Sequence, residues 1–106
     1  MKSKIATRPM PSNFQRFEFN RDLLPNPAAF YANEGVKLLG TGDWRKALCP
    51  FHGDMKPSLS VRFETGAFKC HSCGVHGGDV LAFYMQRYGV RFIEAAKALG
   101  AWEVAR

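Results

Sequence analysis

Two short segments decide the fold of this chain: Cys49-Pro50-Phe51-His52 and Cys70-His71-Ser72-Cys73. Each is a pair of metal-binding residues three positions apart, and seventeen residues separate the two pairs. A tight turn aims both side chains of a pair at one point, and seventeen residues allow a turn and a hairpin to bring the pairs together. Four nitrogen and sulfur ligands in a tetrahedron suit Zn(II). The pattern therefore predicts one zinc ion, held by Cys49, His52, Cys70 and Cys73.

Three other residues near the two pairs could take part in the site. His71 and His76 compete for the fourth ligand position. However, the His71 side chain is expected to point away, and a site using His76 would leave the first pair with one ligand. Asp54 is expected to be a loop residue that could orient His52 by accepting a hydrogen bond. Since four protein ligands leave no position for water, we expect a structural site without zinc chemistry.

The composition fits one small metal-stabilised domain. A chain of 106 residues can form a single compact core, and a bound metal would add stability to a domain of this size. Three cysteines suit a disulfide framework badly and suit metal binding in a reducing compartment. The sequence has neither a bilayer-spanning apolar run nor a secretory signal, so we expect a cytoplasmic protein with no membrane partner. The net charge of +6 favours an anionic partner.

Hydrophobic patterns outside the two pairs predict an antiparallel sheet flanked by helices. Strands are expected at 44–48, 58–63 and 67–70, with a turn at 64–66. Helices are expected at 27–39, at 80–88 after the N-cap Asp79, and in a last segment that ends at Gly100. That last helix should carry one apolar face, made of Phe92, Ile93, Ala96 and Leu99. The expected fold class is α+β, a small zinc ribbon with one metal site.

The first residues have no sustained helical or strand period. We expect 1–20 to be a mobile basic tail from which Phe17 and Phe19 can contact the domain, and 21–106 to be the zinc-ribbon domain.

Several motifs occur in a fixed order along the chain: Cys49-Pro50-Phe51-His52, Lys56-Pro57-Ser58, the strand pair, Cys70-x-x-Cys73-Gly74, Gly78-Asp79-Val80, Phe83, and Arg91 to Ala96. Together they resemble the Cys-His-Cys-Cys zinc-binding domain of bacterial DnaG-type primases, over about residues 24–102. The loop at 74–79 is one residue longer than in cellular primases and resembles versions from plasmids, phages and integrated elements. The resemblance implies a domain that holds single-stranded DNA and helps select where primers begin.

Primases of this family also carry a catalytic toprim core, which the resemblance does not include. Two-metal nucleotidyl transfer needs gathered carboxylates, whereas the aspartates here are scattered: Asp22, Asp43, Asp54 and Asp79. No glycine-rich lysine loop is present to hold a triphosphate. We therefore expect no autonomous enzyme, but an accessory protein that acts beside a separate primase catalytic subunit or a helicase.

A DNA-binding face can be predicted from the strand alternation. Single-stranded DNA is bound by cations along its phosphates and by rings on which bases stack. If Leu59, Val61, Phe63 and Phe68 face the core, polar and basic side chains share the opposite face, with Arg45 near its edge. Trp44 is a candidate stacking ring, although the sequence leaves open which side of its strand faces the core. The expected DNA-binding residues are Trp44, Lys46, Lys56, Ser58, Ser60, Arg62 and Lys69.

Two other functions fit a zinc ribbon. The chain could be a protein–protein docking or regulatory module of a mobile element, with the apolar final helices as its partner surface. A transcription regulator of duplex DNA is disfavoured, because no helix is basic along one face.

Overall fold

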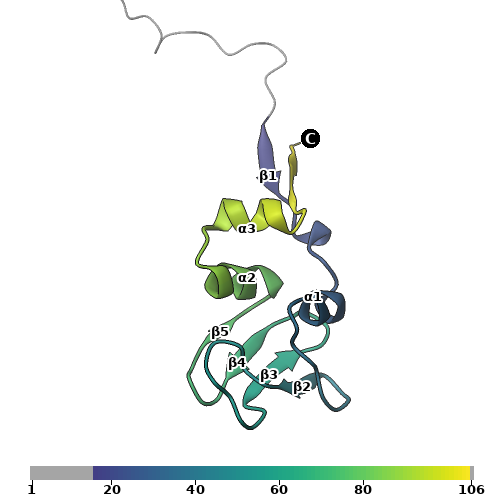
Figure 1. Ribbon diagram of the computed structural model, residues 1–106. Helices are drawn as coiled ribbons and strands as arrows, with labels where there is room; N and C mark the ends of the chain where they lie inside the picture. Colours follow the sequence, from purple (N-terminus) through teal and green to yellow (C-terminus); the bar gives the residue numbers. More distant parts are fainter. Residues whose placement is uncertain (1–15, 106) are drawn as a thin grey trace, which may run out of the picture.

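The computed structural model describes residues 16–105, which form two antiparallel sheets and three α-helices (Figure 1). The α+β class predicted from the sequence is confirmed. Of the segment predicted to be a mobile tail, residues 1–15 lie outside the described residues, and Phe17–Phe19 forms a strand. Among residues 16–105, no helix has both the length and the apolar character needed to cross a bilayer.

The main sheet has four strands in the order β2-β3-β4-β5, all antiparallel. Its strands are β2 (Trp44–Ala47), β3 (Leu59–Arg62), β4 (Phe68–Cys70) and β5 (His76–Gly77). The first three match the predicted strands closely, whereas β5 lies in a segment predicted to be a loop. A side chain at Gly77 would have no room, since its Cβ would lie 2.6 Å from both Ala82 and the Phe68 ring.

The helices lie on one side of this sheet, with the last of them stacked beyond the second and away from the sheet (Figure 1). They are α1 (Pro27–Asn33), α2 (Val80–Tyr88) and α3 (Phe92–Ala98), and a 3₁₀ turn, η2 (Arg21–Leu23), precedes α1. Helix α2 has the predicted bounds, with the Asp79 side chain accepting from the Ala82 N–H and Gly89 in the left-handed region. Helix α1 ends six residues earlier than predicted.

The short α1 has a local cause. Gly35 has a φ of +76°, a conformation that stops a helix and favours glycine. The Val36 N–H then donates to the Tyr31 carbonyl, so Val36 is buried although it lies beyond the helix. Leu39 leaves the helical path altogether and bridges to Lys46 on β2. The sequence predicted a longer helix because apolar residues at helical spacing, such as the buried Val36, continue past the residue at which α1 ends.

The main core is aromatic. Phe30, Tyr31 and Phe68 pack around Phe83, with ring centroids 4.9 to 5.7 Å from it and edge-to-face geometry. The Tyr31 hydroxyl donates to the Gly66 carbonyl at 2.7 Å, which fastens the β3–β4 turn to α1. Leu59 and Val61 complete the core from the sheet, as predicted.

Phe63 lies on the predicted side of the sheet but at its edge. It follows β3, is 38% exposed and lines a hollow with Ala32 and Val36 beside α1. The guanidinium of Arg45 lies 3.7 Å from the Phe63 ring centroid. Arg45 is therefore on the helix-covered side of the sheet rather than beside the open face.

A second, smaller cluster joins α3 to the strand pair β1 (Phe17–Phe19) and β6 (Trp102–Val104). Ala95 and Ala96 are fully buried there, whereas Phe92 and Ile93 are 40% and 45% exposed. The predicted apolar face of the last helix is therefore confirmed in part. Ala96 and Leu99 pack in this cluster, and Phe92 meets the Phe19 and Trp102 rings edge to face. Ala95 rather than Ile93 provides the remaining close contact. Figure 1 places this strand pair at the end of the molecule opposite the main sheet.

Candidate metal centre

The structure brings together the four side chains predicted to hold zinc. Their ligand atoms all lie within 4.8 Å of one another. The sulfurs of Cys49 and Cys73 are 3.8 Å apart, and His52 Nε2 is 3.4 Å from the Cys70 sulfur. A tetrahedron with Zn–S of about 2.3 Å and Zn–N of about 2.0 Å has edges of about 3.5 to 3.8 Å. Both the donors and their spacing therefore fit one four-coordinate Zn(II).

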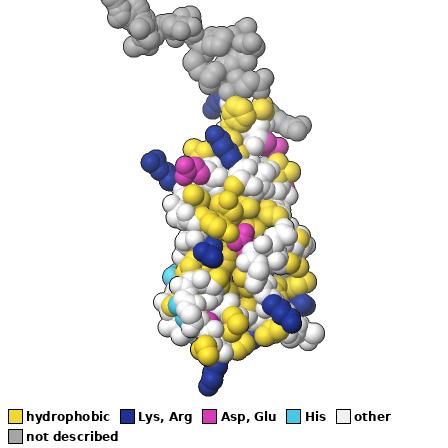
Figure 2. Space-filling model, in the orientation of Figure 1, with side chains coloured by type: hydrophobic (Ala, Val, Ile, Leu, Met, Phe, Trp, Pro, Cys, Tyr) yellow, Lys and Arg dark blue, Asp and Glu magenta, His cyan; other side chains and the backbone are white. Residues whose placement is uncertain are grey.

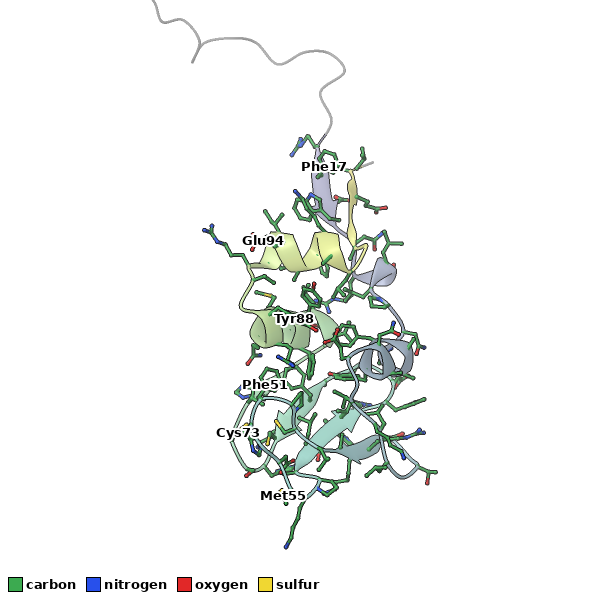
Figure 3. The ribbon with its side chains drawn as sticks, viewed as in Figure 1. Phe17, Phe51, Met55, Cys73, Tyr88 and Glu94 are labelled. Atoms are coloured by element: carbon green, nitrogen blue, oxygen red, sulfur yellow. The ribbon has the colours of Figure 1, made fainter. Side chains whose placement is uncertain are left out.

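Each ligand pair sits on a turn that is fixed by the sheet. Cys49 follows β2, and Cys70 is the last residue of β4, where it pairs with Leu59. The turn after Cys70 directs the N–H groups of Ser72 and Cys73 at the Cys70 sulfur, at 3.4 and 3.3 Å. Figure 3 shows Cys73 at the edge of the sheet region, with Phe51 above it toward the helices.

The two buried thiols differ in their electrostatic environment. Burial raises the pKa of Cys70, but N–H groups of Cys73 and Ser72, the Ser58 hydroxyl and the His52 ring outweigh it, so that the pKa is lowered. Burial raises the pKa of Cys49, and the neighbouring thiols raise it further. Zinc binds thiolates, so a zinc ion at this centre would favour the ionised form of its cysteine ligands.

Asp54 holds the first ligand pair in place, a role that the sequence did not reveal. Its Oδ2 atom accepts from the Cys49 N–H at 2.9 Å, the Ser58 N–H at 3.2 Å and the Ser58 hydroxyl at 2.7 Å. The Cys49 N–H, followed by the Ser58 donors, lowers the pKa of this carboxyl group. Among the described residues the Asp54 carboxylate accepts no hydrogen bond from the His52 ring; the two residues are joined through the backbone, where the Asp54 N–H donates to the His52 carbonyl at 2.9 Å. The sequence feature that could have indicated this role is a single carboxylate in the loop between the first ligand pair and β3.

Ser58 also turns toward the metal centre. Besides Asp54, its hydroxyl lies 3.4 Å from the Cys70 sulfur. The residue precedes β3, and its carbonyl accepts from the His71 N–H at 2.9 Å. Ser58 was predicted to belong to the DNA-binding face. Its hydroxyl instead contacts Asp54, which binds the first ligand pair, and the Cys70 sulfur of the second ligand pair.

The remaining predicted DNA-binding residues fall into two groups. The strand register places five of them on the face of the main sheet opposite the helices: Trp44, Lys46, Ser60, Arg62 and Lys69. We call these five residues the open face. Lys56 is exposed but lies in the loop between His52 and β3, outside the sheet.

Trp44 was left open between core and surface, and the structure places it on the surface. Its side chain is 52% exposed and stands opposite Arg62 on β3. Ser60 pairs with Lys46 on one side and Lys69 on the other, so two cations flank one hydroxyl across three strands. The open face thus combines one large ring with three cationic side chains.

The other two histidines lie beside the open face and outside the ligand cluster. His71 Nε2 is 3.1 Å from the Ser60 hydroxyl, and His76 Nδ1 is 3.1 Å from the Gly74 carbonyl. His76 stands opposite Lys69 on β5. A shallow hollow in the open face is lined by Trp44, Ser60, Lys69 and His71.

Comparison with known proteins places this arrangement among zinc fingers. The family model of the CHC2 zinc finger matches residues 31–104. The DNA primase of Geobacillus stearothermophilus is 46% identical over 68 residues, which are 64% of this chain and 11% of that primase. The Gene 58 protein of Mycobacterium phage D29 is 44% identical over 55 residues, which are 52% of this chain and 42% of the phage protein.

A solved structure shows the same similarity. The crystal structure of the Aquifex aeolicus primase, with its zinc-binding and RNA polymerase domains, matches with a TM-score of 0.62 and 29% identity. The match covers 78% of this chain and 21% of that one. The chain spans about a tenth of the length of the curated primases it matches. The zinc-finger match and the four-ligand cluster together assign one structural zinc ion to this centre.

Proposed function

The chain belongs to the CHC2 zinc-finger family, and from this premise we propose that it binds single-stranded template DNA during primer synthesis in DNA replication. The open face is the binding surface in this proposal. The observation that carries it is the exposed Trp44 ring beside Lys46, Arg62 and Lys69 on one side of a rigid sheet. Cations neutralise phosphates, and each base stacked on an aromatic ring contributes about 1 to 3 kcal/mol.

The charge arrangement supports this choice of surface. Lys46 and Lys69 flank Ser60 across neighbouring strands, and Lys69 carries no ion pair among the described residues. Arg62 is held only loosely by Glu64, at 3.9 Å, and its side chain is 44% exposed. A phosphate oxygen can therefore reach the outer N–H groups of this guanidinium.

Catalysis belongs, in this proposal, to a separate primase subunit, with which the chain works in the cytoplasm. The Geobacillus and Aquifex relatives are primases, and the Aquifex structure pairs a zinc-binding domain with an RNA polymerase domain. In this chain Asp54 is bound to Cys49 and Ser58, and Asp79 caps α2 and pairs with Arg21. Within residues 16–105, the zinc ligands are the one group of three or more His, Cys, Asp or Glu residues placed to hold a metal. These aspartates thus have structural tasks.

A charge-reversal experiment tests the DNA-binding surface. The zinc-loaded protein is titrated into labelled single- and double-stranded oligonucleotides, with fluorescence anisotropy measured at several salt concentrations. We expect tighter binding to single strands, with log affinity falling by about 0.7 per phosphate contacted for each unit of log salt. Arg62→Glu with Lys69→Glu should abolish binding.

The matched control reverses the same number of charges on the helices, at Arg87 and Lys97. These residues are exposed on α2 and α3, on the other side of the sheet. The control variant should keep most of its DNA affinity. Equal losses in both variants would show that net charge, rather than the open face, attracts DNA.

A second candidate function is docking to a protein partner, and one observation favours it. Phe92 and Ile93 are largely exposed on α3, and Figure 2 shows hydrophobic side chains gathered over the helices and again at the strand pair. We propose the catalytic primase subunit as the occupant, because an RNA polymerase domain accompanies the zinc-binding domain in the Aquifex relative. Phe92→Ser with Ile93→Ser should then abolish primer synthesis with that subunit while DNA affinity stays unchanged.

A further inference from the structure

We propose that the hollow in the open face is a subsite for one unstacked nucleobase that presents a carbonyl oxygen, in which Lys69 selects the base and His71 helps to bind it. This inference rests on the DNA-binding function proposed above and adds a residue that the sequence analysis did not include. The hollow is lined by Trp44, Ser60, Lys69 and His71.

The residues that line the hollow come from three strands and from the turn between the zinc ligands Cys70 and Cys73. Ser60 and Lys69 are direct cross-strand neighbours on β3 and β4, so their side chains stand next to each other on the same face. Trp44 enters from β2, where it is 52% exposed. His71 lies in the turn after Cys70, and its Nε2 atom is 3.1 Å from the Ser60 hydroxyl. A flat ring on one side and three polar groups on the other are the parts of a base-binding pocket.

The polar groups favour a particular base edge. A lysine ammonium has three donors and no acceptor, so Lys69 requires an acceptor on the base. Guanine presents two acceptors, O6 and N7, and thymine presents O4, whereas the same edge of adenine has the single acceptor N7 beside an amino group that would meet the ammonium donor to donor. The Ser60 hydroxyl and the His71 ring share one hydrogen bond, and each can offer a further donor or acceptor to the base.

The metal centre gives His71 its fixed position. The residue lies between the ligands Cys70 and Cys73, and its N–H donates to the Ser58 carbonyl at 2.9 Å. Its backbone is thus held from both ends, and the imidazole is in place before a base arrives. A site with pre-positioned groups loses less entropy on binding than one on a mobile loop. The turn that carries the zinc ligands Cys70 and Cys73 therefore also positions the base subsite.

The test uses short single strands that are abasic except for one central position, filled with dT, dG, dA or nothing. Binding to the zinc-loaded protein is measured by anisotropy and by quenching of Trp44 fluorescence, with Trp102→Phe introduced so that one tryptophan reports. We expect dT or dG to raise affinity over the abasic strand by about 5- to 150-fold, and Trp44 to be quenched. The dA strand should gain less.

Three variants probe the polar groups of the hollow, and a fourth is their control. Lys69→Met should reduce the preference for dT over dA by about 5-fold, as expected for one lost hydrogen bond. His71→Ala and Ser60→Ala should each weaken binding of the dT and dA strands by a similar factor, because these groups can donate or accept. Ser60 lies on β3, so its variant keeps the test decisive if His71→Ala disturbs zinc binding. His76→Ala changes a histidine on the same face that does not line the hollow and should leave the preference unchanged.

The outcomes separate this inference from the function on which it rests. If strands bind in a salt-dependent way but the central base, the Lys69 variant and the His71 variant make no difference to base preference or affinity for the base, the base subsite is wrong and backbone binding stands. If the wild-type protein binds no single strand at all, the DNA-binding function itself fails.

Discussion

Replacing Asp54 by alanine tests how the metal centre is held together. Three donors converge on its Oδ2 atom: the Cys49 N–H, the Ser58 N–H and the Ser58 hydroxyl. The first fixes the start of one ligand pair, and the other two fix the start of β3, which leads through the hairpin to the second pair. Asp54→Ala leaves all three donors without this acceptor. The hydrogen bonds that hold the two ligand pairs in position relative to each other are then lost.

The expected loss can be placed on a scale. Groups that orient metal ligands typically contribute about 10- to 100-fold to metal affinity. Because three hydrogen bonds meet at one carboxylate oxygen here, we expect Asp54→Ala to weaken zinc binding by about 100-fold. Asp54→Asn retains one carbonyl oxygen but loses the charge, and about 10-fold is expected for it.

The assay is a competition titration of zinc between the protein and a chromophoric chelator. The pH is held constant because thiols release protons when they bind metal. Asp43→Ala is the control, since Asp43 is exposed, carries the same charge and contributes nothing to the ligand cluster. An Asp54→Ala affinity equal to that of Asp43→Ala would refute the reasoning.

Two further predictions concern folding. Removal of zinc by a strong chelator should unfold the domain, because structural zinc supplies about 10 kcal/mol or more of apparent binding energy in comparable peptides; an unchanged circular dichroism spectrum after verified removal would contradict this. Tyr31→Phe should cost about 1 to 2 kcal/mol in urea unfolding, because the buried Gly66 carbonyl loses its donor. Tyr88→Phe should cost less, because its hydroxyl bonds Glu34 at the surface, and equal costs would argue against the buried bond.

The spacing of the zinc ligands could be predicted because it is a local property. Each pair is set by one tight turn, and the hairpin between the pairs follows from the alternation at Leu59 and Val61. The same alternation indicated which residues share the open face. It could not orient Trp44, because that requires the register of β2 against β3, with Trp44 opposite Arg62.

The features that sequence reasoning missed depend on distant contacts or on very short elements. Strand β5 has two residues and exists because β4 lies beside it. Strand β1 pairs with β6, which lies more than eighty positions later in the chain, and three residues are too few to show a period. The role of Asp54 depends on the path of the loop backbone, which no residue pattern encodes.

The pairing of β1 with β6 has a consequence for how this domain can be engineered. Phe17 stands opposite Val104, so the two ends of the described chain leave the molecule side by side (Figure 1). They do so at the end remote from the zinc centre. A domain with adjacent ends can be spliced into a surface loop of another protein without stretching its host. Such a graft would present the open face on a narrow stem, pointing away from the host and accessible to a passing strand.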